Sequence, residues 1–223
     1  MTTNFSSTRT RIKICGLTRV QDVRACTQSG ADALGFVFYP PSKRFVSALH
    51  AAELCADLPA FISTVALFVN PDPQTVKDVI HTLRPSLLQF HGDEDPGFCA
   101  SFGVSYLKAF RVGGPGLDTA ANVAKACQAF LQASGWLFDS YTPAFGGSGQ
   151  GFDHALLSEL SRADVATRPM ILSGGLNAQN ARVAVQTFAP WAVDVSSGVE
   201  ESPGVKSIQK INDFVRAVYQ ASR

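Results

Sequence analysis

Two side chains in this sequence, the thiol of Cys15 and the carboxyl group of Asp139, are suited to acid–base chemistry. Each stands at the end of a short apolar stretch that has the length of a buried strand. Lys13 precedes Cys15 by two residues, and alternation along a strand puts both side chains on one face. Because an adjacent ammonium group favours the thiolate, we expect the pKa of the Cys15 thiol to fall from about 8.5 toward neutrality. On opposite sides of a small substrate, the two groups could take a proton from a carbon and give one to an oxygen.

Each of these two residues also has an ordinary structural explanation. A cysteine in an apolar stretch is more often a buried, inert thiol than a base. Asp139 could cap a loop or form an ion pair with Lys13. It serves as an acid at neutral pH only if burial, for instance against Trp136 or Phe138, favours its protonated form. Taken singly, neither residue identifies an active site.

Three further polar side chains, Arg44, His91 and Asp194, lie at or after the ends of other strand-like stretches. Arg44 belongs either to a solvated basic loop or to a site in which its guanidinium group binds a substrate carboxylate through two hydrogen bonds. Asp194 could accept a hydrogen bond from a sugar hydroxyl or neutralise Lys13. We expect His91 to organise its loop and do not assign it a catalytic role.

Glycine-rich segments follow the last three strand-like stretches. Because glycine has no side chain, the backbone N–H groups of such a segment can approach an anion and point at it. Most loop glycines only form turns, but three such segments at consecutive strand ends favour a phosphate site. The residues expected to bind phosphate are Gly147, Ser148, Gly149, Gly174, Gly175, Ser196, Ser197 and Gly198.

Strand-like and helix-like stretches alternate along the whole chain. The pattern predicts strands at residues 11–15, 33–38, 64–69, 87–90, 105–110, 135–139, 169–172 and 191–195. Strict alternation predicts an α/β fold with a parallel sheet. Eight units in this length favour a single (β/α)8 TIM barrel over an open doubly wound sheet, which would be unusually wide. The active sites of such barrels lie at the carboxyl ends of the strands, where Cys15 and Asp139 stand.

Helices are expected between these strands, and several have a candidate N-cap residue. The pattern predicts helices near residues 19–28, 47–57, 73–82, 96–102, 117–132, 177–187 and 207–220, with another from residue 153. Thr18, Ser47 and Asn177 stand where a side-chain oxygen would cap the helix that follows.

Composition narrows the class of protein. The 223 residues carry a formal net charge of +1, with no basic stripe and no apolar run of membrane-spanning length, so neither nucleic acid nor a membrane is an expected partner.

Residues 1–10 are polar and lack the core of a secretory signal; we expect a flexible lead-in, followed by one catalytic barrel domain over residues 11–223. Neither the five cysteines nor the four histidines show metal-site spacing, which favours reduced thiols, a cytoplasmic location and no metal or other cofactor.

Several short motifs, taken together, carry a family resemblance. They lie at residues 13–18, 30–38, 41–44, 67–70, 89–92, 138–139 with 146–149, 173–176 and 193–200. In these motifs the chain resembles the phosphoribosylanthranilate isomerases of tryptophan biosynthesis, and the resemblance extends from about residue 11 to the C-terminus. Two positions depart from the common family pattern, Phe90 and the segment Phe138-Asp139-Ser140, where Leu and Leu-Asp-Thr are common. Neither departure changes a reactive group.

The resemblance implies an Amadori rearrangement that needs no cofactor. N-(5-phosphoribosyl)anthranilate would become 1-(2-carboxyphenylamino)-1-deoxyribulose 5-phosphate, a step of L-tryptophan biosynthesis. By analogy, Asp139 would protonate the ribose ring oxygen, Cys15 would take the proton from C2, and Arg44 would hold the anthranilate carboxylate. Backbone amides of the three glycine-rich segments would hold the phosphate. We expect the protein to be a monomer or a homodimer that binds this small phosphoribosyl substrate.

Three alternatives remain open on sequence grounds. A related sugar-phosphate isomerase of histidine biosynthesis is similar in fold and chemistry, but it has an Asp where this chain has Cys15. A lyase could form a Schiff base with Lys13, although a residue one pleat below the strand end is poorly accessible. A non-catalytic barrel that binds sugar phosphates would have no need for both Cys15 and Asp139.

Overall fold

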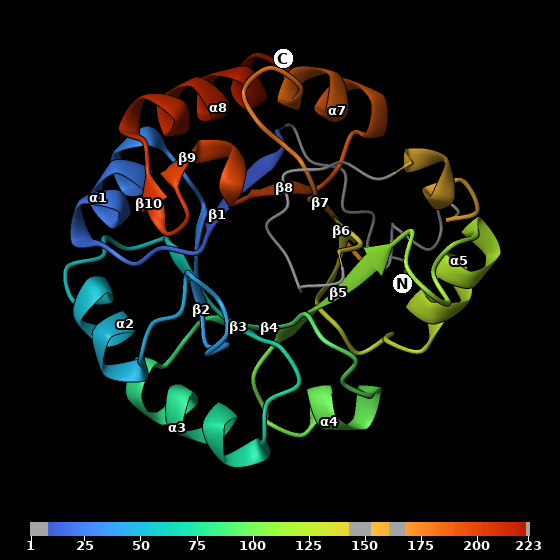
Figure 1. Ribbon diagram of the computed structural model, residues 1–223, viewed down its shortest axis with the longest axis horizontal. Helices are drawn as coiled ribbons and strands as arrows, with labels where there is room; N and C mark the ends of the chain where they lie inside the picture. Colours follow the sequence, from blue (N-terminus) through green and yellow to red (C-terminus); the bar gives the residue numbers. More distant parts are fainter. Residues whose placement is uncertain (1–8, 143–152, 161–167, 222–223) are drawn as a thin grey trace.

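Eight parallel strands form a closed barrel in the computed structural model, which describes residues 9–142, 153–160 and 168–221. The strands are β1 (Arg11–Cys15), β2 (Ala33–Val37), β3 (Ser63–Phe68), β4 (Leu87–Phe90), β5 (Tyr106–Val112), β6 (Gly135–Ser140), β7 (Met170–Leu172) and β8 (Ala192–Val195). Each strand pairs with its neighbours in sequence, and β1 also pairs with β8, which closes the ring (Figure 1). The predicted (β/α)8 barrel is therefore confirmed.

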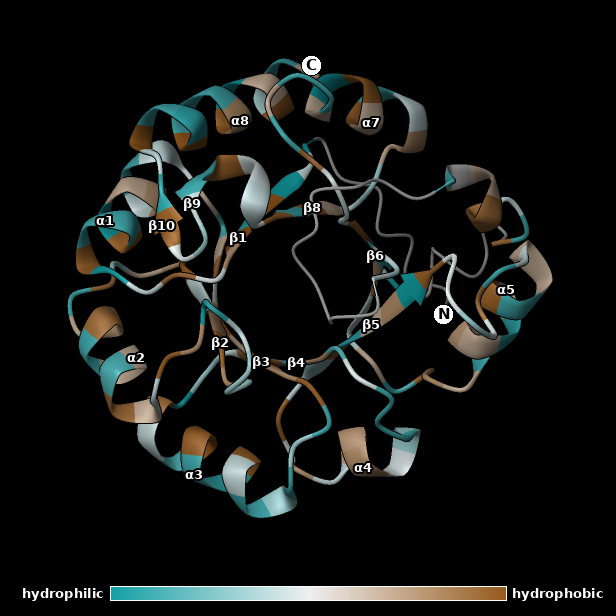
Figure 2. Ribbon diagram, in the orientation of Figure 1, coloured by the Kyte–Doolittle hydropathy of each residue, from teal (hydrophilic) through white to brown (hydrophobic). Residues whose placement is uncertain are grey.

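Helices form an outer ring around the barrel (Figure 1). They are α1 (Val20–Ser29), α2 (Ala48–Cys55), α3 (Pro73–Leu83), α4 (Pro96–Ala100), α5 (Ala120–Gln128), α7 (Ala181–Phe188) and α8 (Ile208–Ala221), with short 3-10 turns η1 (His154–Leu157) and η2 (Ser197–Val199). In α8 the buried residues recur at helical spacing, as Ile211, Phe214, Val215 and Val218. Hydropathy colouring shows hydrophobic and hydrophilic residues interspersed along the helices of the ring (Figure 2). Within the described ranges, no helix is long and apolar enough to cross a membrane.

The predicted helix caps are only partly correct. Ser47 caps α2, where its side chain accepts a hydrogen bond from a backbone N–H of the first turn. Thr18 does not cap α1, because its hydroxyl instead donates to the carbonyl oxygen of Gly204 at 2.6 Å. Asn177 lies before α7 and accepts from the N–H of Asn180, so it closes a turn ahead of the helix. The side chain of Thr18 bonds to a distant loop, and that of Asn177 bonds within its own loop. The local sequence pattern reveals neither contact.

Alternate strand residues point into the barrel or toward the helices. The barrel floor is an apolar cluster of inward-facing side chains, Leu107, Ala109, Leu137, Ile171 and Ala192. Asp139 and Asp194 each follow a member of this cluster by two residues on the same strand, so both face the interior near the carboxyl ends. The outward-facing positions carry stacked phenylalanine rings, among them Phe68 against Phe38 and Phe90. Above this floor, polar side chains occupy inward-facing positions near the strand ends, among them Lys13, Asp139 and Asp194.

A two-stranded hairpin follows β8 and was not expected from the sequence. It consists of β9 (Glu200–Ser202) and β10 (Val205–Lys206), paired antiparallel. Gly204 occupies the turn with a φ of +84°, a conformation that glycine adopts without steric strain. In Figure 1 the hairpin lies between α1, α8 and β1. Lys206 of β10 donates to the carbonyl oxygens of Cys15, which ends β1, and of Ser196, which follows β8.

The first residues lie outside the described part of the chain, which begins at Arg9. Thr10 is buried, and its hydroxyl donates to the carbonyl oxygen of Pro190 at 3.2 Å. The division at residue 10 between a lead-in and a barrel domain stays a prediction.

We expect Phe214→Ala in α8 to lower the free energy of unfolding by about 3–5 kcal/mol, because it removes a fully buried ring and leaves a cavity. Ile208→Ala in the same helix removes a side chain that is 56% exposed and should change stability by no more than about 0.5 kcal/mol. Urea unfolding followed by circular dichroism measures both. Equal losses for the two variants would contradict the packing described for α8.

Candidate active site

Cys15 ends β1 and is buried at the barrel mouth beside Lys13. Gly35 of β2 pairs with Cys15 in the parallel register. A Cβ atom at position 35 would lie 2.8 Å from Sγ of Cys15 and 3.1 Å from Nζ of Lys13. The thiol of Cys15 and the ammonium group of Lys13 are hydrogen-bonded to each other. Only glycine at position 35 leaves room for both groups.

Lys13 forms a buried ion pair with Asp194. Its Nζ donates to Oδ1 of Asp194 at 2.8 Å, and the two side chains are only 5% and 6% exposed. The register of β1 and β8 pairs these two residues directly. Burial alone would lower the pKa of Lys13, but Asp194 and Cys15 together outweigh it and raise that pKa, which favours the charged ammonium group. Of the two roles considered for Asp194, the structure shows the neutralisation of Lys13.

The pKa of the Cys15 thiol is raised, not lowered as the sequence predicted. Burial has the largest effect and disfavours the thiolate, and the charge of Asp194 acts in the same direction. Lys13 and Lys206 lower the pKa but do not outweigh burial. Alternation along the strand identified the neighbouring cation but not the depth of burial. A thiolate of raised pKa is also a stronger base once it has formed.

Arg44 lies in the loop between β2 and α2 and is held by Glu200 of the hairpin. Nε and Nη2 of Arg44 donate to Oε1 and Oε2 of Glu200 at 2.8 and 2.7 Å. Lys206 donates both to Oε1 of Glu200 at 2.8 Å and to the carbonyl oxygen of Cys15 at 2.6 Å. Arg44 and Cys15 are thus brought to the same side of the mouth. The sequence did not identify Glu200 as an ion-pair partner, and it gave no sign of a role for Lys206. The one available signal was that the final motif ends at Glu200.

Asp139 lies near the end of β6 and faces His91, which directly follows β4. Oδ2 of Asp139 is 3.1 Å from Nε2 of His91, and Oδ1 accepts from the N–H of Ser140 at 2.8 Å. The other ring nitrogen of His91, Nδ1, is 3.0 Å from Nε2 of Gln89. Nε2 of His91 is buried and makes no hydrogen bond among the described residues, although it faces Asp139. The sequence had suggested only a loop-organising role for His91.

The glycines after β7 and β8 allow close packing of two loops beside Asp139. Gly174 and Gly175 have φ angles of +82° and +66°, which favour glycine. A Cβ atom at Gly174 would clash with the hydroxyl of Ser140, the residue that follows Asp139, and would lie 3.1 Å from Oδ1 of Asp139. A Cβ atom at Gly198 would clash with the carbonyl oxygen of Leu176. Side chains at these two positions would therefore displace the acid or separate the loops.

The remaining residues predicted to bind phosphate are only partly described. Ser196 and Ser197 directly follow β8, and the hydroxyl of Ser196 donates to the carbonyl oxygen of Cys15 at 3.1 Å. Gly147, Ser148 and Gly149 lie outside the described residues.

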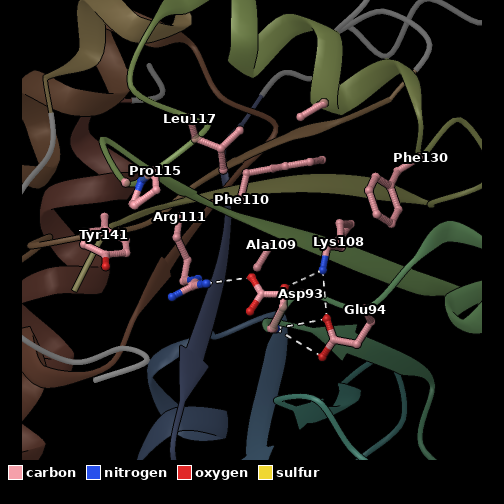
Figure 3. A pocket seen from close by; sticks show the side chains of 13 residues that line it. Asp93, Glu94, Lys108, Ala109, Phe110, Arg111, Pro115, Leu117, Phe130 and Tyr141 are labelled. Carbon is pink, nitrogen blue, oxygen red and sulfur yellow. Dashed lines mark hydrogen bonds and ion pairs between the residues drawn. The ribbon is translucent and has the colours of Figure 1, made fainter. Parts of the chain in front are cut away.

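A cavity of about 430 Å³ lies beside β5 and is lined by the loop after β4, by the loop between β5 and α5, and by Ala126, Phe130 and Tyr141 (Figure 3). Its polar lining includes two ion pairs, Lys108 with Glu94 at 2.8 Å and Arg111 with Asp93 at 2.7 Å. None of the predicted site residues lines it. The cavity is therefore separate from the acid–base groups of the mouth.

In the part of the chain that the structure describes, no group of three or more His, Cys, Asp or Glu side chains is arranged to hold a metal ion. The cysteines Cys15, Cys26, Cys55, Cys99 and Cys127 are all free thiols.

These features define a class. A (β/α)8 barrel that carries a thiol, a carboxyl group and an arginine at the carboxyl ends of its strands, with glycine-rich loops after β7 and β8, is a barrel enzyme of the acid–base type.

Comparison with known proteins identifies the family within this class. The family model described as N-(5′-phosphoribosyl)anthranilate (PRA) isomerase matches residues 12–217. An N-(5′-phosphoribosyl)anthranilate isomerase of Bordetella petrii is 58% identical over 213 residues, which cover 96% of each chain. The crystal structure of phosphoribosyl anthranilate isomerase from Thermotoga maritima is 37% identical, with a TM-score of 0.83 over 94% of this chain and 98% of that one. The chain belongs to the N-(5′-phosphoribosyl)anthranilate isomerase family.

A further solved structure bears on the ligand. It is a phosphoribosyl anthranilate isomerase in complex with reduced 1-(o-carboxyphenylamino)-1-deoxyribulose 5-phosphate, 34% identical with a TM-score of 0.79 over 94% of this chain and 98% of that one. The predicted family and the predicted aldose–ketose isomerase of tryptophan biosynthesis are confirmed. The assignment sets aside the isomerase of histidine biosynthesis, the Schiff-base lyase and the non-catalytic barrel.

Substitutions of the buried ion pair should move the pKa of the Cys15 thiol in opposite directions. Asp194→Asn removes the negative charge that raises this pKa, so the thiolate should form at lower pH than in the wild type. Lys13→Met removes a positive charge that lowers the pKa, so the thiolate should form at higher pH. Thiolate ultraviolet absorbance against pH measures both shifts.

In each background the same titration of a Cys15→Ser derivative isolates Cys15. This control is needed because burial also raises the pKa of Cys26 and Cys99 to about 12 and that of Cys55 to about 11. Shifts of the same sign in Asp194→Asn and Lys13→Met would show that the pair does not control the thiol through its charges.

Proposed function

We propose that the barrel mouth isomerises N-(5′-phosphoribosyl)anthranilate, with Asp139 as general acid and Cys15 as general base. The observation that carries this assignment is the placement of a thiol and a carboxyl group as inward-facing residues at the ends of two separate strands, β1 and β6, in a chain of this family. A sugar between them would have one proton-transfer group on each side.

The first step falls to Asp139. Its carboxyl group gives a proton to the ribose ring oxygen, the C1–O bond breaks, and the open chain is a Schiff base with the anthranilate nitrogen. His91 contacts the same carboxyl group at Oδ2, and the N–H of Ser140 donates to Oδ1. The hydrogen bond from Ser140 orients the carboxyl group, and His91 lies against its other oxygen.

The second step falls to Cys15. Its thiolate takes the proton from C2 of the Schiff base, the electron pair of the C–H bond moves toward nitrogen, and an enolamine results that tautomerises to the ketone. Lys13 and Lys206 place positive charge near the sulfur and stabilise the thiolate that burial disfavours. The raised pKa leads us to expect that kcat/KM for proton removal increases with pH as the thiol ionises.

The remaining predicted residues hold the substrate. Arg44 binds the anthranilate carboxylate, and the backbone N–H groups of the loops after β6, β7 and β8 bind the phosphate. Among the described residues, no hydrogen bond is donated by the N–H groups of Gly174 and Gly175, which supports their assignment to the anion. Asp194 uses Oδ1 for Lys13, and we assign Oδ2 to a sugar hydroxyl.

We also propose a cytoplasmic location and a catalytic domain over residues 11–223. The five free thiols support a reducing compartment. One solved structure, 34% identical with a TM-score of 0.79, shows monomers generated from the dimeric phosphoribosylanthranilate isomerase of Thermotoga maritima. The notion that this chain is a monomer or a homodimer agrees with both states of that relative.

Cys15→Ser and Asp139→Asn should each lower kcat by about 100- to 10,000-fold, because each removes one proton-transfer group and keeps its size. Loss of the substrate's fluorescence measures turnover, and binding of the reduced product analogue should stay close to that of the wild type. Cys55→Ser, at a half-buried thiol of α2, is the matched control and should keep full activity. Near-normal turnover by either active-site variant, with the fold intact, would refute its assigned role.

Arg44→Ala should raise KM by about ten- to a hundredfold and change kcat less, because it removes a charge-assisted contact to the substrate carboxylate. Lys43→Ala removes the adjacent exposed cation and should leave KM close to the wild-type value. Steady-state kinetics of both variants test this. An unchanged KM for Arg44→Ala would exclude the proposed carboxylate contact.

A further inference from the structure

The hairpin after β8 places a buried carboxylate, Glu200, directly behind Arg44. We propose that Glu200 is a positioning residue for substrate selection, because it holds Arg44 by one edge of the guanidinium group and turns the other edge toward the substrate carboxylate. This inference rests on the proposed role of Arg44. It adds a residue that touches no substrate but decides how strongly the enzyme prefers a carboxylated aromatic ring.

The hydrogen bonds of Arg44 divide its guanidinium group into a used edge and an open edge. Nε and Nη2 donate to the two oxygens of Glu200 at 2.8 and 2.7 Å. The second edge, formed by Nη1 and the other proton of Nη2, has the same fork geometry and can bind a second carboxylate. Among the described residues, Nη1 has no hydrogen-bond partner.

The stem of Arg44 is fixed as well as its head. A Cβ atom at Gly16 would lie 2.4 Å from Cδ of Arg44, so the arginine stem crosses the chain directly over this glycine. Gly16 has a φ of +77°, which favours glycine at this position on backbone grounds too. With stem and head both held, a carboxylate would meet an arginine that has little rotamer freedom left to lose.

Glu200 is buried and carries its charge because two cations share it. Its side chain is 4% exposed, and Lys206, whose side chain is fully buried, donates to Oε1 at 2.8 Å. Burial alone would raise the pKa of Glu200, but the bonds from Arg44 and Lys206 outweigh it and lower that pKa. The group of two cations and one carboxylate has a net charge of +1, so a second carboxylate on Arg44 would balance it.

Lys206 ties the same group to the proposed base. Its Nζ donates to the carbonyl oxygen of Cys15 at 2.6 Å and to that of Ser196 at 3.1 Å. Cys15 ends β1, and Ser196 directly follows β8; the pairing of these two strands closes the barrel. The hairpin therefore sets the distance between the ring carboxylate on Arg44 and the carbon that faces Cys15.

The test measures preference for the carboxylate, which a merely structural role would not change. Two probes are needed: reduced 1-(o-carboxyphenylamino)-1-deoxyribulose 5-phosphate and the same compound with hydrogen in place of the carboxyl group. The wild type should bind the first about ten- to a hundredfold more tightly in calorimetric titrations. Glu200→Gln should lower this ratio by about tenfold, with KM raised more than kcat is lowered.

Glu201→Gln makes the same substitution one residue along the hairpin, at an exposed side chain, and should keep the wild-type ratio. If Glu200→Gln does not fold, Glu200→Asp keeps the charge, withdraws the carboxylate by one methylene and should still lower the ratio. A wild-type ratio in the folded Glu200 variant, with the ratio lost in Arg44→Ala, would overturn this inference and leave the proposed function intact. A wild-type ratio in Arg44→Ala would overturn the role of Arg44 and this inference with it.

Discussion

The buried ion pair between Lys13 and Asp194 is the interaction on which the site depends. Either charge alone inside the barrel would be strongly destabilising, because it would be buried without a partner. The 2.8 Å contact lets an ammonium group lie directly below Cys15, and Gly35 leaves the space that both groups need. The same constraint recurs at the mouth, where Glu200 is buried between Arg44 and Lys206. The proposed base therefore lies beside a balanced ion pair, Lys13 with Asp194, and next to Lys206 of a group of two cations and one carboxylate.

This arrangement also explains where the structure is least tolerant of change. The paired charges join β1 to β8 and to the hairpin, so they fasten the barrel at the point where the ring closes. Asp139 belongs to the other side of the mouth and is held by His91 and by the close approach of Gly174. The proposed acid and the proposed base thus have separate supports, and a change to one need not disturb the other.

The sequence predicted the strands and the barrel because each depends on a local pattern. Alternation put Lys13 and Cys15 on one face, and the regular spacing of strands and helices indicated eight units. It could not decide between two roles for Asp194, because that choice depends on a contact across 181 residues. Glu200 is separated from Arg44 by 156 residues, and residues 200–206 resemble an ordinary loop, so neither the hairpin nor its ion pairs were expected. The direction of the Cys15 pKa was wrong because it depends on depth of burial, which only the folded barrel shows.

A crystal structure of this chain with reduced 1-(o-carboxyphenylamino)-1-deoxyribulose 5-phosphate would test the central claim most directly. The account predicts that C2 of the sugar lies in contact with Sγ of Cys15, at about 3–3.5 Å, and that Asp139 contacts the oxygen derived from the ring. The ring carboxylate should lie on the Nη1 edge of Arg44. A complex in which C2 faces Asp139 or His91, with the thiol remote from the sugar, would contradict the assignment of Cys15 as the base.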